Sequence, residues 1–457
     1  MDGTQLPKLV SPPPGPLARE WVARLAEVEC PAITARRVER SRDGVDDPIV
    51  WASARGANVV DVDGNRYVDL SAGFAVASIG HAHPKVVEAG QRQLETLIHG
   101  MGDLFPSTPK ILLGERLAAL TPGDLQHSIL GANGSDAVEA CIKTAQIATG
   151  KRRVLSFAGS YHGMSLGALR VSGYRDSFRT PFDVPSELRL PYPGSGVCRG
   201  ACRAGGCDFG CLETLDAMLG SDVSGSADVA AVIVEPMQGR GGDLVPPTGW
   251  LSMLREVTAR HGVLLIADEI YTGFGRTGRW FACEHENVVP DLMAVGKGLG
   301  GGVPISACVG RAEVMERWGQ TRGEGLHTST FLGNPLTCAM ALASLDVMES
   351  EDLVARSATL GAKLSGWLEQ AIGGHPRVGA LRGRGLMQGV ALLDEAGQAW
   401  AGGGVVAMGA LLRAGFIVSP AGRLGDVLSL SPPLVVTEAQ LEAGVAAISS
   451  WVRSLPE

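Results

Sequence analysis

The sequence contains few lysines and few aromatic residues, and it has no long apolar run. Only seven of the 40 basic residues are lysines, and aromatic residues make up 5% of the 457 positions. A membrane-spanning helix needs roughly 18 to 20 apolar residues, whereas the longest core-like run covers residues 229–234. The formal net charge is −8. These features exclude a membrane span and argue against a surface that binds nucleic acid.

The N-terminal segment lacks the features of a secretion signal. Its first twenty residues contain Asp2 and the prolines at 12–14 in place of a basic segment followed by an apolar one. We therefore expect a cytoplasmic protein in which the nine cysteines stay reduced. A short amphipathic piece at residues 18–28 predicts an arm that packs on another element, most simply in a dimer contact.

The chain between about residues 110 and 310 alternates short β-rich apolar runs with helical stretches. This alternation predicts an α/β fold with a mostly parallel sheet covered by helices. Residues 59–70 predict a hairpin that turns at Gly64-Asn65. We expect an N-terminal arm and hairpin over 1–85, a large domain over 86–345, and a C-terminal α+β segment over 346–457. The first and last segments together form the smaller domain.

Reactive side chains follow the apolar runs, where parallel sheets bind their ligands. Asp268 ends one run, and a buried carboxylate there needs a cation or hydrogen bonds. Lys297 follows another run between two glycines, and desolvation makes such a lysine a nucleophile for Schiff-base chemistry. The loop 131–135 precedes a helix, whose free N–H groups can bind phosphate. Pyridoxal phosphate requires these three features together.

A nicotinamide-dependent dehydrogenase is the competing interpretation. The glycines within 273–278 and 296–301 each fit the spacing of a dinucleotide-binding loop. That loop should open a helix, but the first segment leads into Trp280-Phe281 and the second into a strand-like run at 305–309. We therefore reject the dehydrogenase.

From about Trp51 to its C-terminus, the sequence resembles the class III pyridoxal-phosphate aminotransferases, the group of ornithine, 4-aminobutyrate and ω-amino acid aminotransferases. The resemblance implies the fold-type-I architecture and a homodimer whose active sites lie at the subunit interface. The matching motifs are Gly-His-Ala-His-Pro at 80–84, Asn-Gly-Ser-Asp-Ala at 133–137, Tyr-His-Gly at 161–163, Glu-Pro-Met-Gln-Gly at 235–239, Ala-Asp-Glu-Ile at 267–270, the glycine-containing segment 273–278, Gly-Lys at 296–297, and Thr-Phe-Leu-Gly-Asn-Pro at 330–335.

The resemblance also implies a role for each matching residue. Lys297 would form the imine with the cofactor and carry the proton, while Asp268 would keep the pyridine nitrogen protonated. The other cofactor-binding residues implied are Gly134, Ser135 and the partner-contributed Thr330 at the phosphate, Tyr161 and Ile270 on the two ring faces, and His162 and Glu235 beside them.

The sequence departs from the family in the substrate pocket. Members that use 2-oxoglutarate typically bind its α-carboxylate with an arginine near the C-terminus, but Ser429 occupies that position here. Arg240 stands where those members often carry a glutamate. We expect Arg240 either to take over carboxylate binding or to pair with a local acid such as Asp243. Phe74 and Gly102 are further candidate substrate residues at the mouth of the pocket.

The implied activity is transfer of an amino group from an amine or amino acid, most simply an ω-amino donor, to a keto acid or aldehyde in ping-pong half-reactions. An amino-acid racemase or epimerase of the same family is the alternative, because it needs the same lysine and no second substrate. A dialkylglycine-type decarboxylase and a regulator that only binds the cofactor are less favoured.

Four cysteines lie close together in a glycine-rich segment. Cys198, Cys202, Cys207 and Cys211 could bind zinc. Their spacing differs from the usual C-x2-C pattern of structural zinc sites, so we predict no metal site.

Overall fold

The computed structural model describes residues 2–35, 48–184, 187–196, 198, 208–320 and 325–456. Contacts divide the chain into two compact units. The small unit combines Met1–His83 with Ala355–Glu457, and the large unit is Pro84–Val354. As predicted, the smaller unit therefore joins segments from both ends of the chain. In the described part of the chain, no helix has both the length and the apolar character needed to span a membrane.

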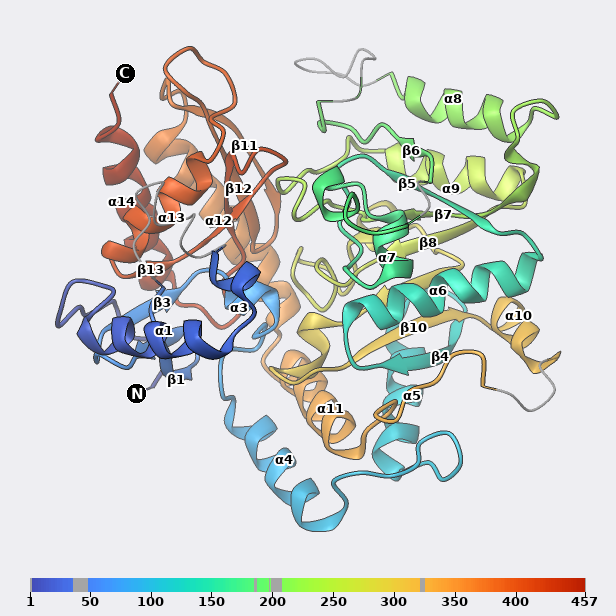
Figure 1. Ribbon diagram of the computed structural model, residues 1–457, viewed down its shortest axis with the longest axis horizontal. Helices are drawn as coiled ribbons and strands as arrows, with labels where there is room; N and C mark the ends of the chain where they lie inside the picture. The colour runs from blue at the N-terminus through green and yellow to red at the C-terminus, as the bar shows by residue number, and fades with distance from the viewer. Residues whose placement is uncertain are drawn as a thin grey trace. The chain divides into compact units, whose positions relative to one another are not determined.

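The large unit is built on one sheet of seven strands in the order β4-β10-β9-β8-β7-β5-β6 (Figure 1). Neighbouring strands from β9 to β6 run parallel, whereas β10 is antiparallel to both β4 and β9. The predicted mostly parallel sheet is therefore confirmed. The strands are β4 (Leu125–Gly131), β5 (Arg153–Phe157), β6 (Arg189–Leu190), β7 (Val229–Val234), β8 (Leu264–Asp268), β9 (Leu292–Val295) and β10 (Ser306–Arg311).

Helix α6 (Gly134–Thr149) lies across this sheet and packs on β4, β7, β9 and β10 (Figure 1). Its buried face is made of small side chains such as Ala137, Ala140 and Cys141, which allow the helix to approach the strands closely. A capping box between Asn133 and Asp136 starts the helix. The sequence therefore fixes where the N-terminus of α6 lies, at the end of β4.

Other helices of the large unit cover the sheet or pack on one another. Helix α11 packs on α4 and α5, and α9 packs on β8. The remaining bounds are α4 (Pro84–Thr96), α5 (Thr108–Leu120), α7 (Leu166–Val171), α8 (Gly210–Leu219), α9 (Trp250–Arg260), α10 (Ala312–Met315) and α11 (Pro335–Ser350), with 3₁₀ turns η1 (Asp176–Phe178), η2 (Ser226–Asp228), η3 (Ala282–Glu286), η4 (Lys297–Gly300) and η5 (Glu316–Gln320).

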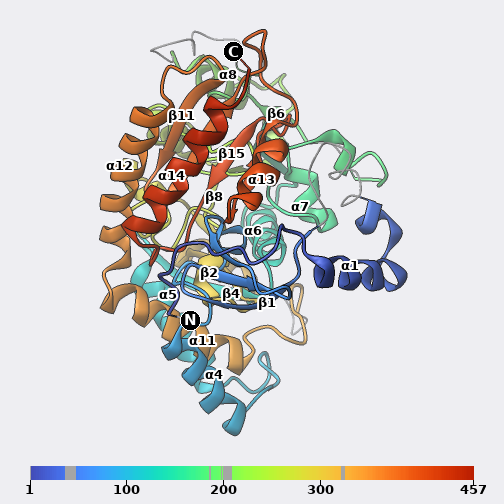
Figure 2. The same cartoon turned by 90° about the vertical axis from the view of Figure 1, so that its left-hand side faces the viewer.

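The small unit contains two sheets of four strands each, β1-β2-β3-β13 and β11-β12-β15-β14. Strands β2 and β3 form the predicted hairpin. Figure 2 shows α12, α13 and α14 running alongside the second sheet. The bounds are β1 (Trp51–Arg55), β2 (Asn58–Asp61), β3 (Arg66–Asp69), β11 (Val378–Arg384), β12 (Met387–Leu392), β13 (Phe416–Ile417), β14 (Ser419–Ala421), β15 (Val427–Leu430), α1 (Pro16–Val28), α3 (Ala72–Ala75), α12 (Leu353–Ile372), α13 (Gly403–Arg413) and α14 (Glu438–Arg453).

The N-terminal arm packs on the hairpin of its own unit. The side-chain oxygen of Asn65 accepts a hydrogen bond from Val10 N at 2.8 Å. The Asp63 carboxylate accepts bonds from Leu17 N at 2.8 Å and Ala18 N at 2.9 Å, so it caps the first turn of α1. Polar side chains of the hairpin thus order the arm. A dimer contact by this arm stays a prediction.

Asp291 connects three elements of the large unit at the start of β9. Its buried carboxylate accepts a hydrogen bond from Leu265 N of β8 at 2.7 Å. It also pairs with Arg255 of α9 at 2.6 Å and with Arg311 of β10 at 3.2 Å. Removing one member of such a buried network leaves the remaining charges without compensation.

We expect Asp291→Ala to lower the free energy of unfolding by about 3 to 5 kcal/mol, because it removes the carboxylate that binds Arg255 and Leu265 N and one of the partners of Arg311. Asp124 is a matched control, since it pairs with the same Arg311 at 3.0 Å but is half-exposed. Asp124→Ala should cost less than about 1 kcal/mol. Urea unfolding of both variants measures the difference, and equal losses would contradict the role given to Asp291.

Candidate active site

The candidate site lies at one edge of the large sheet, where several strands end. Strands β5, β7, β8 and β9 run parallel, so their carboxyl ends meet at this edge. The register pairs Asp268 at the end of β8 with Ala294 of β9, three residues before Lys297. Glu235 directly follows β7. Strand direction therefore brings together residues that are far apart in the sequence.

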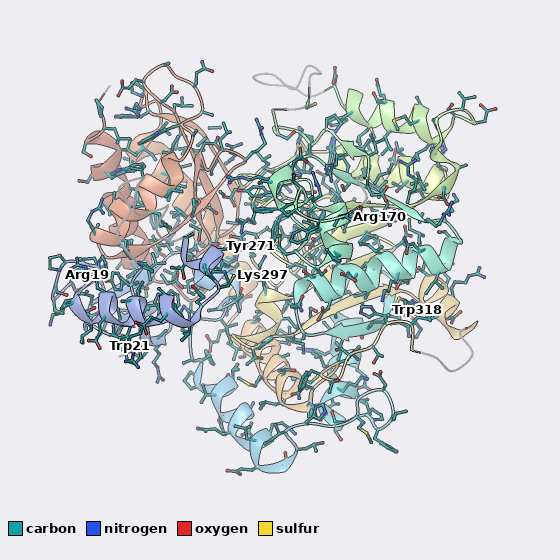
Figure 3. All side chains as sticks on the ribbon, in the orientation of Figure 1. Arg19, Trp21, Arg170, Tyr271, Lys297 and Trp318 are labelled. Carbon is teal, nitrogen blue, oxygen red and sulfur yellow. The ribbon has the colours of Figure 1, made fainter. Side chains whose placement is uncertain are left out.

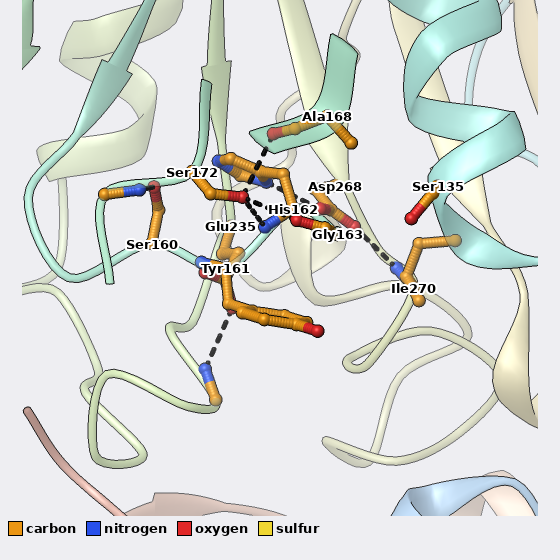
Figure 4. Close-up of polar contacts among 12 residues, drawn as sticks. Ser135, Ser160, Tyr161, His162, Gly163, Ala168, Ser172, Glu235, Asp268 and Ile270 are labelled. Carbon is orange, nitrogen blue, oxygen red and sulfur yellow. Dashed lines mark hydrogen bonds and ion pairs between the residues drawn. The ribbon is translucent and has the colours of Figure 1, made fainter. Parts of the chain in front are cut away.

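Asp268 is held by two hydrogen bonds in a nearly water-free position (Figure 4). Its side chain is 4% exposed. One oxygen, Oδ2, lies 2.6 Å from Nδ1 of His162, and the other accepts a bond from Ile270 N at 3.0 Å. An ionised carboxylate can only accept, so Nδ1 of His162 carries the proton of their bond. His162 is thus the partner that the buried acid needs.

Lys297 follows β9 as the first residue of η4. Its backbone φ of +35° lies in the left-handed region, which costs a residue with a side chain about 1 to 3 kcal/mol. Burial, together with a smaller contribution from Arg240, lowers the pKa of its amine to about 8 against the opposing charges of Asp268 and Glu235. A larger share of this lysine is therefore neutral near pH 7 than of a lysine in water.

Glu235 connects two loops of the site by bonds to their backbones. Its carboxylate accepts a hydrogen bond from Tyr161 N at 2.7 Å and another from Gly239 N at 3.0 Å. Burial raises the pKa of this carboxyl to about 7. Glu235 consequently fixes the backbone that carries Tyr161 and the turn that carries Arg240.

Arg240 lies against two tyrosine rings. Its guanidinium carbon is 4.8 Å from the ring centroid of Tyr161 and 5.2 Å from that of Tyr174. The two rings meet edge to face, with centroids 6.3 Å apart. A guanidinium is attracted to the negative face of an aromatic ring. The cation is thus held beside Tyr161, the residue expected to stack on the cofactor.

The N-terminus of α6 and two glycines form a cradle around Ile270. A Cβ atom at Gly134 would lie 3.1 Å from Ile270, and one at Gly296 would lie 3.0 Å from it. A larger residue at either position would therefore require Ile270 to shift by a few tenths of an ångström. Ser135, in the first turn of α6, accepts a hydrogen bond from Met164 N at 3.2 Å. The unpaired N–H groups of this turn and the helix dipole favour an anion.

Comparison with known proteins identifies the family. The model of the aminotransferase class-III family matches residues 41–452. The chain belongs to the class-III aminotransferases.

Relatives of this aminotransferase cover nearly its whole length. Acetylornithine aminotransferase of Mycolicibacterium smegmatis is 38% identical over 90% of this chain and 95% of its own. Alanine/serine racemase of Pyrococcus horikoshii is 33% identical over 98% of this chain and 93% of its own. The solved structure of an (S)-enantioselective ω-transaminase from Thermomicrobium roseum has a TM-score of 0.84 at 30% identity, over 95% of this chain and 99% of that one. The predicted family and fold are confirmed.

The aminotransferase depends on pyridoxal phosphate, as its family does. The residues at the sheet edge fit this cofactor. A helix N-terminus offers N–H groups to a phosphate. A buried carboxylate can accept a hydrogen bond from a protonated ring nitrogen. Because the pKa of Lys297 is lowered, a larger fraction of its amine is neutral and therefore nucleophilic.

Four of the expected residues come from other segments of the chain. Thr330 is exposed in the segment that precedes α11. A Cβ atom at Gly102 would lie 2.4 Å from the carbonyl oxygen of Leu332, so close packing requires a glycine there. Phe74 and Ser429 belong to the small unit, where Phe74 is 66% exposed and Ser429 is buried in β15.

Two of the four clustered cysteines, Cys202 and Cys207, lie outside the described residues. Cys211 accepts a hydrogen bond from the indole N–H of Trp250 at 3.4 Å. Across the described ranges, no group of three or more histidine, cysteine, aspartate or glutamate side chains could hold a metal ion.

Sequence reasoning missed Tyr271. The amine of Lys297 lies 4.3 Å from the centroid of its ring, and Figure 3 shows the two side chains together. Tyr271 comes three residues after Asp268, at the same end of the sheet. Its position just after a buried strand could have marked Tyr271 as a site residue, but the sequence does not indicate that its ring faces the lysine.

Proposed function

We propose that Lys297 is the residue to which the cofactor attaches and that it carries the proton during amino transfer. Support comes from one observation above all: a partly buried amine with a lowered pKa stands at the strand ends beside the carboxylates of Asp268 and Glu235. When bound, pyridoxal phosphate supplies an electrophilic carbon and a ring that withdraws electrons from the substrate. Neutral Lys297 can then take a proton from the substrate carbon and return it.

The surrounding residues hold the cofactor in this proposal. Asp268, oriented by His162, keeps a proton on the pyridine nitrogen. The remaining contacts are Tyr161 and Ile270 on the ring faces, N–H groups of Gly134 and Ser135 at the phosphate, Thr330 from a second subunit, and Glu235 as support for the loop of Tyr161.

The proposed reaction moves an amino group from an ω-amino donor to a keto acid or aldehyde in two half-reactions. The names of the acetylornithine aminotransferase and ω-transaminase relatives support this donor class. The relative named alanine/serine racemase is 33% identical over 98% of this chain, so racemisation is the alternative. Transamination is favoured over racemisation because the matching family is one of aminotransferases.

Lys297→Ala should abolish both amino transfer and the cofactor adduct that borohydride makes permanent in the wild-type enzyme. The control is Lys363→Ala, since Lys363 pairs with Glu438 on the small unit. Mass spectrometry of the reduced protein locates the adduct. Incubation with amino donors, with and without keto acids, separates amino transfer from loss of optical purity. An adduct on another lysine would refute the assignment.

We also propose that Arg240 binds the carboxylate of substrates, in place of the arginine that Ser429 replaces. Its guanidinium is held on the rings of Tyr161 and Tyr174, beside the expected cofactor plane. An arginine stacked on aromatic rings keeps its N–H groups free to bind a carboxylate at its edge. Phe74 and Gly102 stay candidate substrate residues from the resemblance alone.

Arg240→Ala should raise KM for carboxylate-bearing donors about 10- to 150-fold and spare simple amines, since losing such a pair costs about 1.5 to 3 kcal/mol. Arg175→Ala is the matched control, because Arg175 stacks on the same Tyr174 at 5.1 Å but is exposed. Steady-state kinetics with paired amine and amino-acid donors measures the effect. Equal losses for both donors would show that Arg240 serves only the fold or the cofactor.

We propose a homodimer as the assembly. The segment 97–105 of the large unit exposes five large apolar side chains. Soluble monomers rarely leave such a run open to water. The five are Leu97, Ile98, Met101, Leu104 and Phe105, whose exposed fractions run from 44% to 72%.

Phe105→Glu should shift the protein from dimer to monomer in light scattering because a charge would be buried at the interface. Val223→Glu is the control, since Val223 is 89% exposed and lies between α8 and η2. A wild-type protein that is monomeric at micromolar concentration would refute the dimer. The cytoplasmic location stays a prediction from the sequence alone.

A further inference from the structure

The aromatic ring of Tyr271 lies over the amine of Lys297, with 4.3 Å between Nζ and the ring centroid (Figure 3). This distance is within the range in which an ammonium is attracted to the negative face of a ring. Tyr271 is half-buried, so the contact is partly shielded from water. The attraction is stronger where the cation has lost part of its hydration.

The turn that carries Tyr271 is fixed on both sides by buried groups. Before it, Ile270 N donates to the Asp268 carboxylate at 3.0 Å. After it, the hydroxyl of Thr272 bonds to the carboxylate of Glu269, which also accepts a bond from Cys283 N at 2.8 Å. Glu269 is fully buried. The backbone at Tyr271 is therefore held by bonds that do not involve the lysine that its ring contacts.

Several charges act on the amine of Lys297 besides the ring. Asp268 and Glu235 attract its proton, whereas Arg240 and burial favour its loss. The two acids lie at the ends of β8 and β7, and Arg240 follows in the turn after Glu235. Against this background, a ring face adds an attraction that exists only for the ammonium form.

We propose that Tyr271 is a positioning residue for Lys297, whose ring holds the amine at the end of β9 and stabilises its protonated form. The inference rests on the proposed role of Lys297 as attachment residue and proton carrier. A lysine that is to move a proton at the substrate carbon must stay within reach of that carbon. The ring provides a surface on which the protonated amine can remain.

The test compares Tyr271→Phe, which keeps the ring, with Tyr271→Leu, which removes it. Pyridoxal phosphate is mixed with full-length, cofactor-free protein at a series of pH values, and the rate of its covalent attachment is followed by visible absorption. Attachment requires the neutral amine, so the midpoint of the pH profile reports the pKa of Lys297. Tyr271→Met serves as a second ring-free variant if the leucine variant does not fold.

We expect the wild type and Tyr271→Phe to share one midpoint. The ring-free variant should shift it to lower pH by about half to one and a half units, because the ammonium loses the attraction of the ring. An unchanged midpoint, an equal shift in Tyr271→Phe, or a shift to higher pH would each overturn the proposal. The last result would mean that the ring only excludes water.

The same experiment distinguishes this inference from the proposed function. The attached cofactor is reduced and its peptide identified in every variant. Attachment to a lysine other than Lys297 would refute the proposed function itself. Attachment to Lys297 with an unchanged midpoint would refute only the role of Tyr271.

Discussion

The parallel direction of β5, β7, β8 and β9 is the constraint on which the whole site depends. Each strand ends at the same edge, and each leads to a residue of the candidate site. A strand reversed in this group would carry its residue to the far edge of the sheet. At that far edge Asp291, just before β9, bonds to residues of β8, α9 and β10.

The electrostatics of the edge combine opposite tendencies. Burial favours neutral forms of Lys297 and Glu235, while the neighbouring Asp268 favours the charged lysine. The result is an amine whose pKa lies closer to neutrality than that of a lysine in water.

The main parts of the fold and the reactive centre could be predicted because they depend on short-range signals. An apolar run followed by Asp268 or Lys297 already says that a strand ends there. The pairing of His162 with Asp268 joins residues 106 positions apart and depends on how the loop after β5 folds. The stacking of Arg240 on Tyr161, and the ring of Tyr271 over Lys297, likewise follow from loop conformations that no local pattern encodes. The glycine at 102 needed the structure too, because the backbone that it meets lies 230 positions away at Leu332.

The raised pKa of Glu235 has opposite effects on the folding stability of the protein and on the order of the loop that carries Tyr161. The folded chain keeps a proton on this carboxyl up to about pH 7, whereas an ordinary glutamate releases it near 4.5. Its contribution to folding stability is therefore complete below about pH 4.5 and lost as the pH rises through about 7. The charged form, however, binds the N–H groups of Tyr161 and Gly239 more strongly. In mildly alkaline solution Glu235 is ionised. This ionisation holds the loop of Tyr161, which is expected to cover the cofactor, most firmly, and it also makes the protein easier to unfold.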